Sequence, residues 1–174
     1  IEQIKDDTIY EDLDEWSSLT ALSVIAMIDQ EYGVGIGAKE IIESTTVKGL
    51  YDIVVELKNK MVEDKTILIT GASSGIGESI VKLLASSKAK IILTGRNESK
   101  LQNITSDLAG SEHKYFVADL EEEDHIDELV NGLPKLDGIV FCAGYNEFVP
   151  IKFIKSQKAN KIFNVNYFAS VFLL

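Results

Sequence analysis

An apolar, β-branched run leads directly into a glycine-rich turn at residues 66–77, with the sequence TILITGASSGIG. The run 66–70 is typical of a buried strand, and apolar residues recur at helical spacing after the turn. Gly71 and Gly75 allow a sharp turn and the close approach of a ligand, and Gly77 allows the helix to pack on the strand. The first N–H groups of such a helix carry the positive end of its dipole, so the turn is predicted to bind the pyrophosphate of a dinucleotide.

Strands and helices alternate after this turn. Further apolar strands are predicted at 90–94, 115–119 and 138–141, and helical patterns follow both the turn and the strand at 115–119. This alternation is typical of an α/β protein with a doubly wound parallel (Rossmann) sheet, which binds its ligand at the carboxyl ends of the strands. A helix C-cap beside a loop of glycine and serine would be the alternative, and the strand–turn–helix–strand order argues against it.

The 174-residue chain has an acidic first part and a nearly balanced second part. Residues 1–60 hold nearly half of the 28 acidic side chains but less than a third of the 17 basic ones. We therefore predict two domains, 1–60 and 61–174, joined by a short polar junction. The net charge of −11 favours basic protein partners and repels nucleic acid and anionic membranes, so neither nucleic acid nor a membrane is expected as a partner.

No apolar run has the length to span a bilayer, and the first residues lack the pattern of a signal peptide, so a cytoplasmic protein is expected. The single cysteine, Cys142, excludes an internal disulfide and a cluster of cysteine ligands, and we predict no metal site. Cys142 is predicted to be a small buried residue after the strand at 138–141. His113 and His125 lie in polar or acidic surroundings and are predicted to be solvated.

A small all-α bundle is predicted for residues 1–60. Apolar residues at helical spacing indicate helices at 19–32 and 46–57, and Gly33 is suited to end the first of them. Either Ser17 or Ser18 could cap the first helix with its hydroxyl.

This acidic part resembles an acyl carrier protein. The resemblance is carried by YEDLDEWSSL at 10–19, YGV at 32–34 and TTVKGL at 45–50, in the order and spacing of that family. In that family the serine of an Asp-Ser-Leu triplet carries a 4′-phosphopantetheine arm. The matching triplet here is SSL, so the resemblance implies attachment at Ser18, with a serine in place of the aspartate. A helix start exposes the serine and favours the incoming phosphodiester, whereas the alternative is that Ser18 only caps the helix.

The carrier resemblance covers residues 1–58, and the family has a further helix before the position of Ile1. A longer parent chain or a poorly packed bundle is therefore expected. A phosphopantetheinyl transferase and the enzymes of fatty-acid or polyketide synthesis are the partners that the resemblance implies.

Residues 62–174 resemble the short-chain dehydrogenase/reductases. The glycine turn, Asp119-Leu120, Ala143-Gly144 and NVN at 164–166 follow one another in the order of that family's motifs. The resemblance implies that Asp119 holds the adenine, that Ala143 and Gly144 line the cofactor, and that Asn166 is the first member of an Asn-Ser-Tyr-Lys catalytic group. The predicted cofactor-binding residues are Gly71, Ser73, Ser74, Gly75, Ile76, Gly77, Arg96, Asp119, Leu120, Ala143 and Gly144. The family's Asn-Asn-Ala-Gly reads FCAG at 141–144, so the polar side-chain contacts of that turn are expected to be lost.

Cofactor choice depends on the end of the second strand, where TGRN at 94–97 offers a base and no acid. An acid would accept a hydrogen bond from a ribose hydroxyl of NAD, whereas a guanidinium matches the geometry of a 2′-phosphate. Arg96 therefore favours NADP over NAD. The alternative is that Arg96 is a solvated loop residue.

Together the two resemblances imply NADPH-dependent reduction of a 3-oxoacyl thioester in fatty-acid or polyketide synthesis, with the acyl chain carried at Ser18 and a homo-oligomeric full-length protein. One alternative is a non-catalytic carrier or scaffold module, and another is a dehydrogenase acting on a free alcohol, sugar or steroid. No tyrosine here is followed by lysine four residues later, as the family's proton donor is, so this polypeptide is expected not to catalyse reduction. The two parts of the chain could be a natural fusion or two neighbouring reading frames that have been joined, and the sequence leaves both alternatives open.

Overall fold

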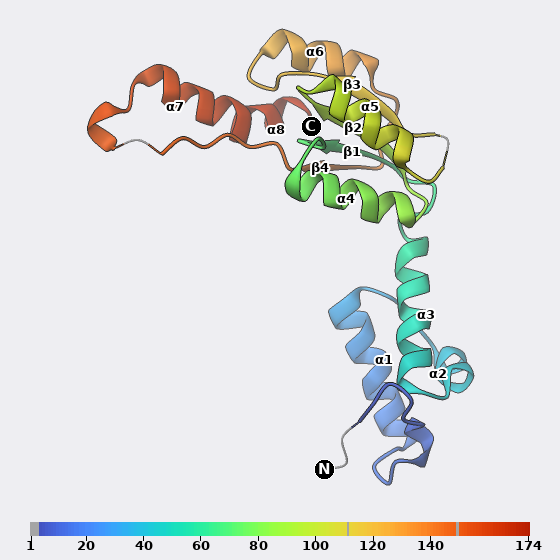
Figure 1. Ribbon diagram of the computed structural model, residues 1–174. Helices are drawn as coiled ribbons and strands as arrows, with labels where there is room; N and C mark the ends of the chain where they lie inside the picture. The colour runs from blue at the N-terminus through green and yellow to red at the C-terminus, as the bar shows by residue number, and fades with distance from the viewer. Residues whose placement is uncertain (1–3, 111, 149) are drawn as a thin grey trace. The chain divides into compact units, whose positions relative to one another are not determined.

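The computed structural model describes residues 4–110, 112–148 and 150–174, and the chain divides into two compact units, Ile1–Met61 and Val62–Leu174 (Figure 1). None of the helices in these described ranges is both long and apolar enough to cross a bilayer.

The first unit is helical. A short 3₁₀ helix, η1 (Tyr10–Asp12), precedes the helices α1 (Ser18–Tyr32), α2 (Ala38–Ser44) and α3 (Val47–Lys60). Helix α1 begins at a serine cap and ends at Gly33, whose φ of 65° is the left-handed conformation that glycine adopts without strain.

Tyr10 is the centre of the first unit's core. Its hydroxyl donates to the carbonyl oxygen of Ile41 and lies 2.5 Å from Oγ of Ser44, and its ring centroid is 4.4 Å from that of Trp16. The side chain is buried, so the second half of α2 is tied to the segment before α1 through one phenol. The buried residues around it are Ile28, Val34, Ile36, Ile41 and Val54.

The second unit is a parallel sheet covered by helices, as predicted for a Rossmann-like α/β fold. Within the described residues the strands run in the order β3-β2-β1-β4, and all three pairings are parallel. The strands are β1 (Thr66–Thr70), β2 (Lys90–Gly95), β3 (Lys114–Val117) and β4 (Gly138–Phe141). Between and after them lie α4 (Gly75–Ser86), α5 (Glu98–Asp107), α6 (Glu123–Gly132), η2 (Ile151–Phe153), α7 (Ser156–Phe163), the π-helical η3 (Asn164–Phe168) and α8 (Ala169–Phe172).

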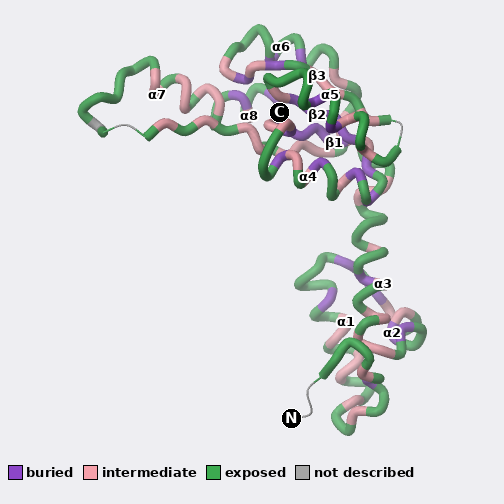
Figure 2. The backbone as a smooth tube through the Cα atoms, in the orientation of Figure 1, coloured by how far each residue is buried: buried purple, intermediate pink, exposed green. Residues whose placement is uncertain are grey.

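Both faces of the sheet are covered, which explains why β1 and β2 are almost continuously apolar. Ile69 and Leu93 face a core that includes residues of α4 and α5, whereas Leu68 and Ile92 face residues of α6 and α8. Figure 2 shows the buried residues concentrated along these two strands.

His113 is half-buried, so the prediction of a solvated side chain was wrong. Its Nδ1 accepts the backbone N–H of Ile91 at 3.1 Å, and its Nε2 lies 2.9 Å from the carbonyl oxygen of Ala109. Both ring nitrogens are satisfied by a neutral imidazole that donates from Nε2. Polar neighbours in the sequence did not reveal this role, because the partner N–H comes from the start of another strand.

The phenol of Tyr10 gives a stability prediction. We expect Tyr10→Phe to lower the free energy of unfolding of the first unit by about 1–2 kcal/mol, because a buried hydrogen bond is lost while packing is kept. Urea unfolding followed by the fluorescence of Trp16, the only tryptophan, measures this unit. Tyr51→Phe is the matched control on an exposed ring and should change stability by less than about 0.5 kcal/mol. Equal stability changes in the two variants would contradict the expectation.

Candidate functional site

The glycine turn between β1 and α4 packs its backbone directly on the turn that follows β4. A Cβ on Gly71 would lie 2.7 Å from the nitrogen of Ala143, and a Cβ on Gly77 would lie 2.3 Å from the carbonyl oxygen of Gly71. Gly71 and Gly75 have φ angles of 64° and 56°, the left-handed conformation that glycine favours. A Cβ on Gly75 would meet open space, so the turn is closely packed at its two ends and open at its middle glycine.

Thr70 holds the turn after β4 in place. Its buried Oγ1 accepts from the backbone N–H groups of Cys142 and Ala143, each at 3.1 Å. The contact fixes the distance between the two turns without any side chain from the FCAG sequence. Sequence reasoning did not single out Thr70, because a threonine at the end of a strand is common.

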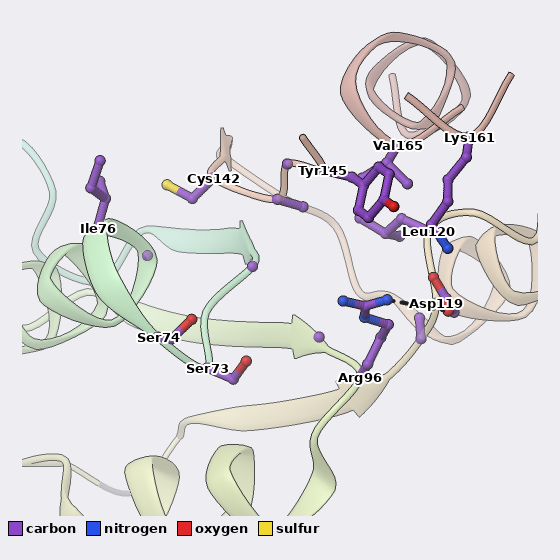
Figure 3. A pocket seen from close by; sticks show the side chains of 16 residues that line it. Ser73, Ser74, Ile76, Arg96, Asp119, Leu120, Cys142, Tyr145, Lys161 and Val165 are labelled. Atoms are coloured by element: carbon purple, nitrogen blue, oxygen red, sulfur yellow. Dashed lines mark ion pairs between the residues drawn. The ribbon is translucent and has the colours of Figure 1, made fainter. Parts of the chain in front are cut away.

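A cavity of about 290 Å³ lies at the carboxyl ends of the strands (Figure 3). All of the predicted cofactor-binding residues except Gly75 line it, namely Gly71, Ser73, Ser74, Ile76, Gly77, Arg96, Asp119, Leu120, Ala143 and Gly144. The sequence analysis missed Gly95, Ala118, Cys142, Tyr145, Lys161 and Val165. Four of these are sequence neighbours of predicted cofactor-binding residues, whereas Lys161 and Val165 come from the helical region after β4, for which no helix was predicted.

Asn166, predicted to be catalytic, is not one of the residues that line this cavity. Its side chain instead binds the backbone of Tyr145, which does line it. Its Oδ1 accepts the backbone N–H of Tyr145 at 2.7 Å, and its Nδ2 donates to the carbonyl oxygen of Tyr145 at 2.8 Å. Both polar atoms of the amide are thus engaged by one residue of the turn after β4. Asn166 lies in the π-helical η3, and such turns often occur at functional sites. Its catalytic role stays a prediction, and the contacts seen are those of a positioning residue.

Tyr145 closes one side of the cavity through a network of charged groups. Its hydroxyl donates to Oε2 of Glu147 at 3.0 Å, Glu147 pairs with Lys158, and the ammonium of Lys161 lies 4.9 Å from the ring centroid. Lys161 also pairs with Glu121, which raises the pKa of the lysine. Donation to Glu147 raises the pKa of Tyr145, and the hydrogen bonds from Lys158 and Tyr145 lower the pKa of Glu147. Tyr145 is therefore held as a neutral phenol.

Cys142 is one of the residues that line the same cavity. The side chain is half-buried, and this burial raises the pKa of the thiol. Cys142 was predicted to be a small buried residue after β4, and the structure places it there half-buried, packed against the core and at the wall of the cavity.

In the first unit the two candidate serines are separated by role. Ser17 is the N-cap of α1, and its Oγ accepts the backbone N–H of Thr20 at 3.2 Å. Ser18 is the first residue of the helix, is exposed, and makes no side-chain hydrogen bond to any residue of the described ranges. The alternative in which Ser18 only caps the helix is therefore wrong.

Known proteins resemble the second unit. Residues 65–174 match the protein family described as short chain dehydrogenase. An uncharacterized oxidoreductase of Staphylococcus aureus (strain MRSA252) is 45% identical over 67 residues, which are 38% of this chain and 29% of that protein. A 3-oxoacyl-(acyl-carrier-protein) reductase of Rickettsia prowazekii (strain Madrid E) is 34% identical over 109 residues, which are 63% of this chain and 45% of that protein. The chain thus spans less than half the length of these relatives.

A solved structure has a fold similar to that of the second unit. An L-sorbose reductase from Gluconobacter frateurii, complexed with NADPH and L-sorbose, gives a TM-score of 0.61 at 25% sequence identity. The likeness covers 64% of this chain and 45% of that one.

The packing of the glycine turn can be tested by adding single methyl groups. We expect Gly77→Ala to lower the free energy of unfolding of the second unit by about 1–3 kcal/mol, because the new Cβ meets the backbone carbonyl oxygen of Gly71. Gly138→Ala, in β4, is the control: its Cβ would meet no atom within 4 Å, and we expect a change below about 0.5 kcal/mol. Urea unfolding followed by circular dichroism measures both, and a similar loss in the two variants would rule out the steric explanation.

Proposed function

This chain belongs to the short-chain dehydrogenase family of oxidoreductases, and we propose that its second unit binds NADPH and that a full-length protein uses the cofactor to reduce a 3-oxoacyl thioester. The observation that carries the proposal is the glycine turn at the cavity, closed to a side chain at Gly71 and Gly77 and open at Gly75. A dinucleotide pyrophosphate needs this arrangement, because the backbone must approach it closely at the positive end of α4. The residues present therefore fit the cofactor.

Arg96 supports NADPH over NADH. It follows β2 at the edge of the cavity, and a guanidinium there matches the geometry of a 2′-phosphate. The L-sorbose reductase of similar fold was solved with NADPH, which is consistent with this choice.

The nicotinamide, when bound, supplies the hydride. This chain's own residues would position it: the glycine turn would hold the pyrophosphate, and Asn166 would keep the turn after β4 in place through its two hydrogen bonds to Tyr145. Thr70 would fix the other side of that turn.

Two observations support an acyl thioester as the substrate. The Rickettsia relative is a reductase of 3-oxoacyl groups on a carrier protein, and the first unit of this chain places Ser18 at a helix start with its hydroxyl free of the cap. We infer that Ser18 carries a 4′-phosphopantetheine arm, attached by a phosphopantetheinyl transferase. Carrier and reductase in one chain would present the acyl group at a raised effective concentration, which would suit the enzymes of fatty-acid or polyketide synthesis as partners.

A free sugar or alcohol is the second candidate substrate, because the likeness to an L-sorbose reductase favours it. Comparing carrier-bound and free 3-oxo substrates on a full-length protein would separate the two.

Cofactor binding can be tested without turnover, because the only cysteine lines the cavity. We expect NADPH to slow alkylation of Cys142 by iodoacetamide, and to do so at lower concentrations than NADH. Arg96→Ala should weaken the NADPH effect about tenfold, because a hydrogen-bonded charge on the 2′-phosphate is lost, and should leave the NADH effect nearly unchanged. Mass spectrometry of the intact chain gives the rates. If saturating NADPH gives no protection in folded protein, the proposed function is wrong.

The carrier role is tested by the two neighbouring serines. After incubation with coenzyme A and a phosphopantetheinyl transferase, we expect the wild type to gain the mass of one arm and Ser18→Ala to gain none. Ser17→Ala is the matched control: it should still be modified, while losing about 1 kcal/mol of stability because the cap of α1 is gone. Modification that persists in Ser18→Ala would contradict the assignment.

A further inference from the structure

Arg96 and Asp119 are brought together by the register of two neighbouring strands. Gly95 pairs with Val117 across β2 and β3, and the N–H of Ala118 donates to the carbonyl oxygen of Gly95 at 3.0 Å. Arg96 follows Gly95 and Asp119 follows Ala118, so both residues lie at the same edge of the sheet. There Nη1 of Arg96 is 3.9 Å from Oδ2 of Asp119, and Figure 3 shows the two side chains directed at each other inside the cavity.

The side chains of Arg96 and Asp119 differ in how firmly they are held. Asp119 is anchored, because its Oδ1 accepts the backbone N–H of Glu121 at 3.1 Å and its side chain is 32% exposed. The Arg96 side chain is 65% exposed on a long flexible stem. A ligand that competes for this ion pair would therefore move the guanidinium and leave the carboxylate where it is.

We propose that Asp119 is a specificity-determining residue that competes with the 2′-phosphate of NADPH for Arg96 and so limits the preference for NADPH over NADH. The proposal rests on the proposed function. To meet the 2′-phosphate, Arg96 must leave Asp119, and the phosphate then adds negative charge beside that carboxylate. NADH has no 2′-phosphate, so neither effect acts on it.

The other cation of the cavity does not take over this role. Lys161 is paired with Glu121 and lies over the ring of Tyr145, so its charge is already shared. The Arg96–Asp119 pair is partly solvated and its two atoms are 3.9 Å apart, which makes it a weak pair. Loss of the Arg96–Asp119 pair should therefore change the ratio of NADPH affinity to NADH affinity by about two- to fivefold, and by less at high salt.

The experiment is a double-mutant cycle read by equilibrium binding. Isothermal titration calorimetry gives the Kd of NADPH and of NADH for the wild type, Asp119→Asn, Arg96→Ala and the double variant. In Asp119→Asn, the asparagine keeps an oxygen that can accept the N–H of Glu121. If this variant does not fold, Asp119→Ser is used in its place. Glu122→Gln is the control, because it removes the same charge from an exposed position three residues away.

The proposal expects Asp119→Asn to raise the NADPH-over-NADH affinity ratio about two- to fivefold, only while Arg96 is present. Glu122→Gln should leave that ratio unchanged. Equal changes in both affinities would overturn the proposal, since Asp119 would then act on the part that the two cofactors share. A rise in the ratio that survives in the Arg96→Ala background would also overturn it. A wild type that binds neither cofactor would instead refute the proposed function itself.

Discussion

The meeting of two backbone turns at the carboxyl ends of β1 and β4 is the contact on which the second unit's site depends. Gly71 approaches Ala143 too closely for any side chain, and the hydroxyl of Thr70 accepts the N–H groups of Cys142 and Ala143. β1 lies between β2 and β4, so this contact fixes the start of α4 relative to three strand ends. The helix therefore directs the positive end of its dipole at the cavity.

Among the described residues, each of the two cations that line the cavity is paired with a carboxylate. Arg96 faces Asp119, and Lys161 pairs with Glu121 while contacting the ring of Tyr145. An anionic ligand must therefore exchange partners with the protein instead of meeting free cations. Such exchanges cost little where the pairs are exposed, so they tune selectivity between similar ligands more than they tune overall affinity.

In the first unit, a shift of one position along the chain separates a capping serine from an exposed one. Ser17 and Ser18 are chemically identical neighbours, yet the hydroxyl of Ser17 is used by the N–H of Thr20, and Ser18 stands exposed as the first helical residue. A capping hydroxyl is bound to the backbone of its helix, whereas an uncapped one is available to a modifying enzyme. The core around Tyr10 holds the segment before α1 that sets this register.

The predicted bounds of β1 and β4 agree with those in the structure. Both strands are short apolar runs between turn residues, a pattern that can be identified from the sequence alone. The strand and helix around the glycine turn were predicted from the same patterns, whereas Asp119, Leu120, Ala143 and Gly144 were predicted from the resemblance to the short-chain dehydrogenase/reductases. The patterns missed α2, α5 and α7, whose short apolar faces are weak signals. Only the tertiary structure decided that Asn166 reaches the backbone of Tyr145 and that Arg96 meets Asp119. Those pairings depend on strand order and on how helices pack across the sheet, and periodicity along one segment carries no information about its neighbours in space.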